Sequence, residues 1–440
     1  MPTPSPPEEA NVTYPATSPA TVLFRNVRIF NGTGETLSAR SHVLVRGATI
    51  ELISATPLSI EDQHATIVIE GGDRVLMPGL IDAHAHTMFM SLPVAIALTA
   101  DTGYVYLVAG VNAERTLLRG FTSVRDVGGP AFALKRAIDE GVVTGPRIYP
   151  SGAMISQTSG HGDFRMRHEL PRGVAGSLSQ MERNGSTAIA DGVDEVLRAT
   201  REQLLMGASQ IKLMAGGGVS SPHDPIDATQ YTEAELHAAV EAAENWGTYV
   251  MVHAYTPNAI QRSIVAGVKC IEHGQLADEP TIALMAEKGI WWSLQPFLDD
   301  EDAIPLSTPD QRANQLLVTN GTVRAYELAK KHGVKLAWGS DTLFDAKLAE
   351  RQGAQLAKLN RWISPAQVLR MATADNAELL ALSGPRNPYP GKLGVIEEGA
   401  LADLLLVDGN PLEDITLVAD PAKAFVVIMK DGTIYKNTLK

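Results

Sequence analysis

Eight short apolar runs recur through the middle of the chain, and a segment with helical periodicity precedes each of them after the first. The runs are Leu80–His86, Phe121–Val127, Arg147–Gly152, Gln210–Ala215, Tyr249–Ala254, Lys269–His273, Trp291–Pro296 and Lys335–Asp341. The helical segments usually end in glycine, the residue favoured just after a helix C-terminus. Eight βα units over about 300 residues predict a (β/α)8 TIM barrel with insertions. An open doubly wound sheet is the alternative, but its nucleotide-binding glycine fingerprint is missing.

The two ends of the chain have a different pattern, with strand-like alternation and no long helical segment between residues 21 and 75. The C-terminal segments ADLLLVDGNPLEDI and AFVVIMKDGTIYKN repeat this style, with a hairpin turn expected at Asp431-Gly432. We therefore predict a small β-sandwich built from residues 21–77 and 386–440, around a barrel of residues 78–385. Residues 1–20, rich in Pro, Ser and Thr, are expected to form an extended arm. The long loops 156–190 and 297–310 are predicted to form walls of a substrate pocket.

Composition narrows the function classes. A formal charge of −13 argues against a nucleic-acid partner, which would require a basic surface. The single cysteine, Cys270, excludes an internal disulfide and a cysteine-based zinc site, and its apolar surroundings predict a buried structural thiol. No apolar stretch is long enough for a membrane span, so no membrane partner is expected. As written the sequence predicts a cytoplasmic protein, or a periplasmic or secreted one if a signal peptide has been removed.

Six residues with metal-binding or acid–base chemistry stand at the C-terminal ends of these predicted strands. They are His84, His86, Lys212, His253, His273 and Asp341. In the His-Ala-His segment, strand alternation places both imidazoles on one face. A lysine inside an apolar strand is costly, and the alternative is a side chain that reaches the barrel rim. If the strands close into a barrel, the eighth lies beside the first and all six converge into a metal centre.

This pattern resembles the metal-dependent amidohydrolase superfamily. The Pro78-Gly79 start, the D-x-H-x-H segment, the lysine on strand four, the histidines on strands five and six and the aspartate on strand eight all match in order, and GALADLLLVDGNP near the C-terminus is similar to the family's ending. The resemblance implies two divalent metal ions, with zinc the first choice, and a metal-bridging hydroxide as nucleophile. The implied ligands are His84, His86 and Asp341 for one ion, His253 and His273 for the other, and an N6-carboxylated Lys212 as the bridge. It also implies that Asp341 is the general base and that the protein is a homo-oligomer.

A second motif bears on the substrate. Ser159-Gly160-His161-Gly162-Asp163 is similar to the SGHGD segment of the branch that holds imidazolonepropionase-like proteins, Xaa-Pro dipeptidases and ochratoxinase. The resemblance implies that His161 bonds to the substrate carbonyl and stabilises the oxyanion. Tyr255 is a candidate for the substrate carboxylate. Arg165 and Trp292 are further candidate contacts, with a solvated loop charge and barrel packing as the alternatives. The glycines at 216–218 lack a following GK[ST], so we interpret them as backbone slack beside the site rather than as a phosphate loop.

These observations predict a metal-dependent hydrolase that acts on a small molecule. The expected substrate is an N-acyl or aminoacyl L-amino acid, such as a dipeptide or an ochratoxin-like N-aroyl amino acid. A cyclic-amide or lactone hydrolase on the same centre is the alternative. A metal-free scaffold from another functional class would be expected to lack ligands, and none is missing.

Overall fold

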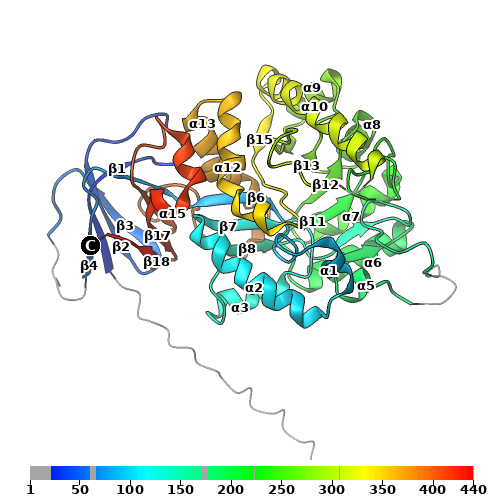
Figure 1. The fold of residues 1–440 in the computed structure, drawn as a ribbon, viewed down its shortest axis with the longest axis horizontal. Helices are drawn as coiled ribbons and strands as arrows, with labels where there is room; N and C mark the ends of the chain where they lie inside the picture. The colour runs from blue at the N-terminus through cyan, green and yellow to red at the C-terminus, as the bar shows by residue number, and fades with distance from the viewer. Residues whose placement is uncertain (1–20, 60–65, 170–176, 222, 307, 440) are drawn as a thin grey trace, which may run out of the picture.

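The computed structural model describes residues 21–59, 66–169, 177–221, 223–306 and 308–439. Over these residues the chain is an α/β protein with three hydrogen-bonded sheets. Figure 1 shows the two ends of the chain together on the left, with β1–β4 in blue beside β17 and β18 in red. The central segments, from cyan to yellow, form the larger part on the right. The expected arm, residues 1–20, lies outside the described residues.

The terminal sheet takes strands from both ends of the chain, as predicted. Its strands are β1 (Thr21–Ile29), β2 (Ser41–Arg46), β3 (Thr49–Ser54), β4 (Thr66–Glu70), β5 (Val75–Pro78), β16 (Leu404–Val407), β17 (Phe425–Lys430) and β18 (Thr433–Asn437). Their order is β18-β17-β16-β5-β1-β2-β3, with β4 paired to β1. Alternate residues such as Val22, Phe24 and Val427 bury a separate apolar core. The predicted hairpin joins β17 to β18, and the positive φ angles of Asp431 and Gly432 are those of a type I′ turn.

The central strands are parallel and fall into two sheets. They are β6 (Leu80–Ala85), β7 (Phe121–Asp126), β8 (Arg147–Pro150), β9 (Met154–Ser156), β10 (Thr187–Ile189), β11 (Ile211–Met214), β12 (Val250–Ala254), β13 (Cys270–His273), β14 (Trp291–Ser293) and β15 (Lys335–Ala337). One sheet has the order β6-β7-β8 and the other β10-β9-β11-β12-β13-β14-β15. Each of the eight predicted strands is present. β14 and β15 end before the predicted Pro296 and Asp341, because the chain there leaves the ladder for the loops.

The third predicted strand, Arg147–Gly152, is wrong in its bounds. β8 ends at Pro150, and the chain resumes as β9 at Met154, which pairs with β10 and β11. Gly152 between them has φ +75°, a left-handed conformation that interrupts a strand. A Cβ on Gly152 would also lie 2.8 Å from the ring of Phe132. The apolar pattern showed the strand but could not show this break.

Backbone hydrogen bonds join the edges of the two parallel sheets. Ala83 of β6 donates to the carbonyl of Trp338, just after β15, at 3.1 Å, and Asp341 donates to the carbonyl of His84 at 2.9 Å. At the other edge, Ser209 donates to the carbonyl of Pro150 at 2.8 Å. The first central strand therefore lies beside the segment that follows the last, and this brings Asp341 to His84.

Helices precede most of the strands. They are α1 (Val94–Thr99), α2 (Thr102–Leu118), α3 (Phe132–Asp139), α5 (Gln180–Arg183), α6 (Val193–Leu205), α7 (Glu233–Asn245), α8 (Pro257–Val265), α9 (Glu279–Glu287), α10 (Pro309–His332), α11 (Ala346–Glu350), α12 (Gln352–Ala357), α13 (Pro365–Arg370), α14 (Asn376–Ala381) and α15 (Pro421–Ala424). In α7, Thr232 and Glu235 form a capping box, and Leu236, Ala239 and Val240 bury the face turned toward β11 and β12. Among the described helices, none combines the length and the apolar character that a membrane span requires.

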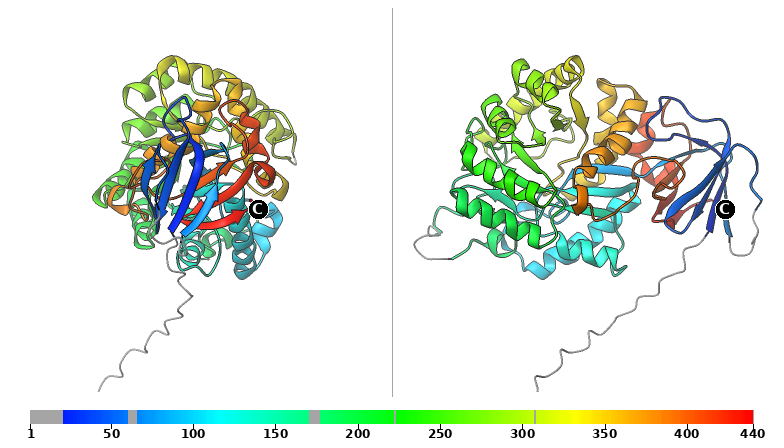
Figure 2. Two further views of the ribbon diagram at one scale, coloured as in Figure 1. Left: turned by 90° about the vertical axis from the view of Figure 1, so that its left-hand side faces the viewer. Right: turned by 180° about the vertical axis from the view of Figure 1, so that it is seen from behind.

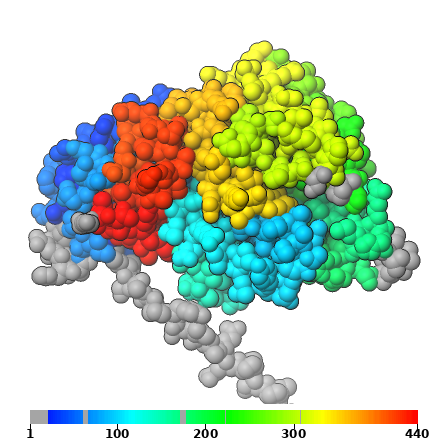
Figure 3. All heavy atoms as spheres, viewed as in Figure 1, coloured from blue at the N-terminus to red at the C-terminus, as the bar shows by residue number. Residues whose placement is uncertain are grey.

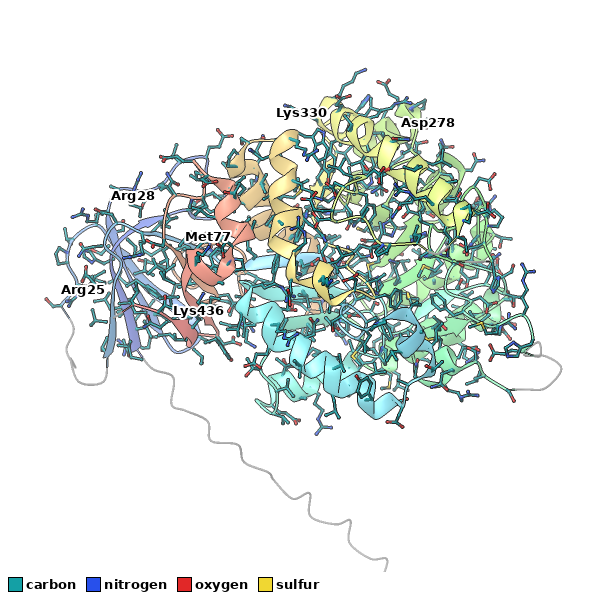
Figure 4. All side chains as sticks on the ribbon, in the orientation of Figure 1. Arg25, Arg28, Met77, Asp278, Lys330 and Lys436 are labelled. Carbon is teal, nitrogen blue, oxygen red and sulfur yellow. The ribbon has the colours of Figure 1, made fainter. Side chains whose placement is uncertain are left out.

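A buried polar junction fastens the terminal sheet to the central part. Nε of Arg147 donates to Asp403 at 3.0 Å, and both side chains are buried. Lys430, also buried, donates to the carbonyl of Gly145 at 2.8 Å. Figure 4 shows Met77 at this junction, with Arg25 and Arg28 toward the outer end of the terminal sheet. Figure 3 shows the two parts in direct contact, and Figure 2 shows the same arrangement from two further sides.

Candidate metal centre

The structure brings the six predicted strand-end residues to one cavity. His84 is in β6, Lys212 in β11, His253 in β12 and His273 at the end of β13, while His86 and Asp341 lie just beyond their strands. All six line the same cavity, together with His161 and Tyr255. His273 and Asp341 have φ angles of +76° and +48°, which are unusual for residues with side chains. Backbone strain of this kind is often found at functional sites.

Asp341 lies among the imidazoles. Its Oδ1 is 3.1 Å from Nε2 of His84 and 3.4 Å from Nε2 of His86, and its Oδ2 is 3.8 Å from Nδ1 of His273. One ligand atom each from His84, His86 and Asp341 lies within 4.8 Å of the others. His84 Nε2 is fully buried and makes no hydrogen bond with the described residues, although Oδ1 of Asp341 lies 3.1 Å away. A free buried nitrogen beside a carboxylate suits a metal ion.

Each of the four histidines presents one ring nitrogen to an acceptor oxygen. Nδ1 of His84 faces Glu272 Oε2 at 2.6 Å, and Nδ1 of His86 faces the carbonyl of Gly128 at 3.0 Å. Nε2 of His253 faces the carbonyl of Gly217 at 3.0 Å, and Nδ1 of His273 faces Oε1 of Gln295 at 2.9 Å. These oxygens can only accept, so the nitrogen that faces each of them carries the hydrogen. The other nitrogen of each neutral ring is then left as a lone pair for a metal.

Burial keeps two of these rings neutral. It lowers the pKa of His273 to about 3, against the opposing charge of Asp341. It also lowers the pKa of His253 well below the ordinary value, helped by its histidine neighbours. For Asp341, burial acts in the opposite direction, but His84 outweighs it and holds the pKa of the carboxyl well below its usual range. Neutral imidazoles and an ionised carboxylate are the forms that bind a divalent metal.

The burial of Lys212 in the cavity wall disfavours the charged form of its side chain. Its side chain is 1% exposed, and its ammonium takes part in none of the hydrogen bonds or ion pairs found between described residues. Burial lowers the pKa of Lys212, although Glu272 and Asp341 oppose this shift. The alternative in which Lys212 reaches the rim does not agree with this burial. A lysine of this kind favours the neutral amine, which is the reactive form.

Two further predicted residues lie beside the histidines. The ring of His161 stacks on His253 at 4.1 Å between centroids, and its Nδ1 lies 3.2 Å from Oδ2 of Asp224. The ring of Tyr255 stacks on His273 at 5.1 Å. Both residues face the cavity beside the proposed metal ligands, as a substrate contact would require.

Trp292 and Arg165 are not brought to the cavity. Trp292 is fully buried in the main core, and its Nε1 donates to the carbonyl of His273. Its large apolar side chain therefore packs in the core and also holds the end of β13. Arg165 forms an ion pair with Asp163 and is not among the residues that line the cavity. The geometry therefore agrees with the alternative given for each residue: Trp292 is a packing residue, and Arg165 is a loop charge.

The glycine run after β11 has a different role from the one predicted. A Cβ on Gly218 would lie 2.9 Å from Cγ of His161 and closer still to other ring atoms. A Cβ on Gly217 would clash with the carbonyl group of Pro225. Glycine is required at these two positions because other segments of the same chain pack directly against them. This part of the run is therefore closely packed and not loose backbone.

The rest of the cavity wall is mainly apolar. Both predicted loops contribute to it, the first through Phe164 and Met181 and the second through Phe297, Leu298, Ala303, Ile304 and Leu306. From other segments come Phe89, Met154, Met214, Val318 and Phe344. A polar centre at the base of an apolar cavity is the usual form of a small-molecule site.

Several supporting residues were missed from the sequence. They are Arg125, Asp224 and Glu272. Arg125 and Glu272 stand inside apolar strands, as Lys212 does, and the same argument about buried charge could have identified them. Asp224 had no such signal, because polar residues are common in loops.

The amidohydrolase family model matches residues 75–438, which is most of the chain. The chain belongs to the amidohydrolase family. This family is metal-dependent, and the chain is a hydrolase that acts on carbon–nitrogen bonds. The ochratoxinase of Aspergillus niger is 35% identical over 382 residues, covering 82% of this chain and 76% of that protein. The imidazolonepropionase of Deinococcus radiodurans is 25% identical over 389 residues, covering 85% of this chain and 86% of that protein.

A solved amidohydrolase structure agrees in fold as well as in sequence. A prolidase in complex with N-methylphosphonate-L-proline superposes with a TM-score of 0.86 at 35% identity, covering 95% of this chain and 100% of that one. These relatives confirm the resemblance predicted from the strand-end pattern and the SGHGD segment.

One prediction concerns how this amidohydrolase holds β6 against the segment before Asp341. A Cβ on Gly339 would lie 2.8 Å from Cα of His84 and closer to its amide nitrogen and Cβ. Backbone cannot give way as a flexible side chain can, so Gly339→Ala should displace His84 and cost about 1–3 kcal/mol of stability. We expect lower metal content by elemental analysis and a lower unfolding temperature.

The control for this variant is Gly110→Ala, in α2, where the added Cβ would meet only Val143 at ordinary contact distance. That helix substitution should be neutral or slightly stabilising. Unchanged metal content in Gly339→Ala would contradict the close packing of β6 on this segment.

Proposed function

We propose that this chain is a binuclear-metal amidohydrolase that cleaves the amide bond of N-acyl or aminoacyl L-amino acids. The observation that carries the proposal is the set of four imidazoles described above. Each has one nitrogen held by an acceptor, and their free nitrogens accompany Asp341 and Lys212 on one cavity wall. A set of this composition suits two divalent ions better than it suits any reaction without a metal.

The residues divide into two ligand sets. His84, His86 and Asp341 would hold one ion, His253 and His273 the other, and a carboxylated Lys212 would be shared between them. Zinc suits these nitrogen and oxygen ligands, and manganese, cobalt or iron would also fit. Bound here, two such ions would lower the pKa of a water molecule toward neutrality and polarise the scissile carbonyl.

The burial of Lys212 supports its carboxylation. The neutral amine attacks the carbon of carbon dioxide, a nitrogen–carbon bond forms as one carbon–oxygen π bond opens onto oxygen, and the nitrogen gives one of its protons to water. The product is a carbamate whose negative charge suits a site that holds cations. Its two oxygens give Lys212 a ligand role that an ammonium cannot have.

Asp341 is the residue best placed to move a proton. Its carboxylate stays ionised at neutral pH and lies on the cavity wall between the imidazoles. It can take a proton from the attacking water and pass it to the leaving nitrogen as the amide bond breaks. The strained backbone at Asp341 fixes the carboxylate in this position.

His161 is placed to stabilise the developing oxyanion. Asp224 accepts from its Nδ1 and is itself held by the backbone N–H of Gly218 at 2.7 Å. With Nδ1 held by Asp224, Nε2 is the ring nitrogen left to face the substrate oxygen. The stack on His253 sets the plane of the ring beside the proposed metal ligands.

Tyr255 and the apolar walls supply the remaining substrate contacts. Burial raises the pKa of Tyr255, so its hydroxyl keeps its proton and can donate to a substrate carboxylate. The phenylalanine and methionine side chains of the cavity favour an apolar acyl group and exclude water. The names of the similar proteins, an ochratoxinase and a prolidase, support an amide of an amino acid as the substrate class.

We further propose that the two parallel sheets form one closed (β/α)8 barrel. The hydrogen bonds at both sheet edges, from Ala83 to Trp338 and from Ser209 to Pro150, support this closure. The terminal sheet would then be the sandwich domain of residues 21–77 and 386–440, and the barrel would be residues 78–385. The core shared by Val22, Phe24 and Val427, separate from the barrel core, supports that division.

We also propose that the chain assembles as a homo-oligomer. Tyr104, Leu107 and Val111 form an exposed apolar stripe on one face of α2, at helical spacing. An apolar stripe of this kind is typical of an interface.

Leu107, 74% exposed, is the central residue of this stripe. Leu107→Asp should lower the mass measured by light scattering, and Leu205→Asp, at a 77% exposed leucine of α6, is the matched control. Equal masses for the wild type and the Leu107→Asp variant would contradict this interface.

The proposed reaction is tested with a substrate panel and the zinc-loaded protein. N-acyl amino acids should each give a carboxylic acid and a free amino acid, and dipeptides should each give two free amino acids, detected by mass spectrometry. A cyclic amide or a lactone would instead give one ring-opened product that is heavier by one water. Turnover of only the cyclic compounds would overturn the proposed substrate class and support the alternative function.

A further inference from the structure

A buried chain of charged groups lies behind the cavity. Glu272 of β13 places Oε2 at 2.6 Å from Nδ1 of His84 and Oε1 at 2.6 Å from Nη2 of Arg125. All three side chains are 0–1% exposed. Neither Glu272 nor Arg125 is among the residues that line the cavity. They therefore have no direct contact with a substrate, and the hydrogen bond that links Glu272 to the cavity wall is the one to His84.

Arg125 is fixed from several strands at once. Its Nε donates to the carbonyl of Ala83 in β6 at 2.6 Å, and its Nη1 donates to the hydroxyl of Tyr249 at 3.2 Å. The thiol of Cys270 donates to Oε1 of Glu272 at 3.1 Å. The guanidinium thus ties β7 to β6, to β13 and to the residue before β12, and it holds Glu272 in place.

Packing alone does not explain this arrangement. A buried ion pair is often no more stabilising than apolar side chains of the same volume, because both charges lose their hydration. Apolar residues would fill the interior as Ala83 and Met251 do nearby. They could not offer an acceptor to Nδ1 of His84.

The four candidate ligands also differ in the kind of acceptor that orients them. His86 and His253 face backbone carbonyls, and His273 faces an amide oxygen. Among these four, His84 alone faces a carboxylate. A carboxylate makes the imidazole a stronger base and a better metal ligand than a neutral oxygen does.

We infer that Glu272, anchored by Arg125, is a positioning residue that fixes His84 as the Nδ1–H tautomer and aims its Nε2 at the metal shared with Asp341. The inference rests on the proposed metal centre and adds that its two ions are bound with different affinities. The ion bound by His84 should be the tighter one, and it should depend on a residue that never touches substrate.

The test is the variant Glu272→Gln, compared with wild type in the full chain. Binding of Zn²⁺ and Co²⁺ is measured by competition with a chelator, and the visible absorption of the Co²⁺-loaded protein reports the ligand geometry. We expect the tighter site to lose about 10- to 100-fold in affinity and its Co²⁺ spectrum to shift. Unchanged affinity and spectrum in a folded variant would overturn the inference.

Two further variants keep the test decisive. Glu272→Gln leaves Arg125 unpaired. The double variant Arg125→Met/Glu272→Gln removes both charges and is measured in the same way. It decides the question if the single variant does not fold. Asp403→Asn is the matched control, because Asp403 is a buried acid paired with a buried arginine and neither residue lines the cavity. It should lower the unfolding temperature and leave Zn²⁺ affinity unchanged. A wild-type protein that binds no divalent metal would instead contradict the proposed function itself.

Discussion

Replacing Lys212 with alanine should abolish hydrolysis and lower the metal content of the purified protein. Lys212 lies on the same cavity wall as all the other candidate ligands, and in the proposed centre it is the ligand shared by the two ions. Removing it takes away a shared ligand, so both ions lose affinity rather than one. The measurements are turnover of a dipeptide and metal per chain by elemental analysis.

Rescue separates a carbamate from a purely structural lysine. Short-chain carboxylic acids fit the space that the side chain leaves and offer the same two oxygens, so they should restore part of the activity of Lys212→Ala. Lys430→Met is the matched control, because Lys430 is a second buried lysine but donates to the carbonyl of Gly145 at the junction with the terminal sheet. That variant should keep its metal. Full activity in Lys212→Ala would remove the carbamate from the mechanism.

Replacing His161 with alanine should reduce turnover by about 10²–10³-fold, the usual effect of one lost oxyanion donor. His161 contacts Asp224 and the ring of His253, but it lies outside the proposed ligand sets. Metal content should therefore stay at the wild-type value. The specific expectation is therefore a large loss of turnover in a variant whose metal content is unchanged.

Asp224→Asn is the companion variant, because it keeps the shape of the loop and removes only the charge opposite Nδ1 of His161. The Asp224 carboxylate is ionised, since its contact with His161 outweighs burial and lowers its pKa. We expect a smaller loss of turnover than in His161→Ala, again with full metal content. A loss of less than about tenfold in His161→Ala would exclude His161 as the carbonyl partner.

The sequence predicts much of this molecule because a strand pattern and a residue's place at the strand end are local properties. The alternation around His84 and His86, the lysine inside an apolar strand and the place of His253, His273 and Asp341 at strand ends predicted which residues would share one cavity. The break between β8 and β9 was not predictable, because it depends on the left-handed backbone of Gly152 and on the ring of Phe132 in α3.

Contacts between distant segments account for the other differences. Trp292 was a plausible pocket wall until the structure placed it in the core, where it donates to the carbonyl of His273. The glycines at 217 and 218 are needed because Pro225 and His161 return to the same place from other parts of the chain. Glu272 and Arg125 could have been identified by the buried-charge argument that was used for Lys212, but only their pairing across strands shows what they do.

The central claim is that the six residues hold two ions and that hydrolysis depends on them. Its most direct test is to remove metal with a chelator, titrate Zn²⁺ back, and follow bound metal and dipeptide hydrolysis in the same samples. We predict no hydrolysis by the stripped protein, and activity that rises with bound zinc and levels off near about two ions per chain. Full activity in the stripped protein, or active protein with less than about one ion per chain, would contradict the binuclear centre.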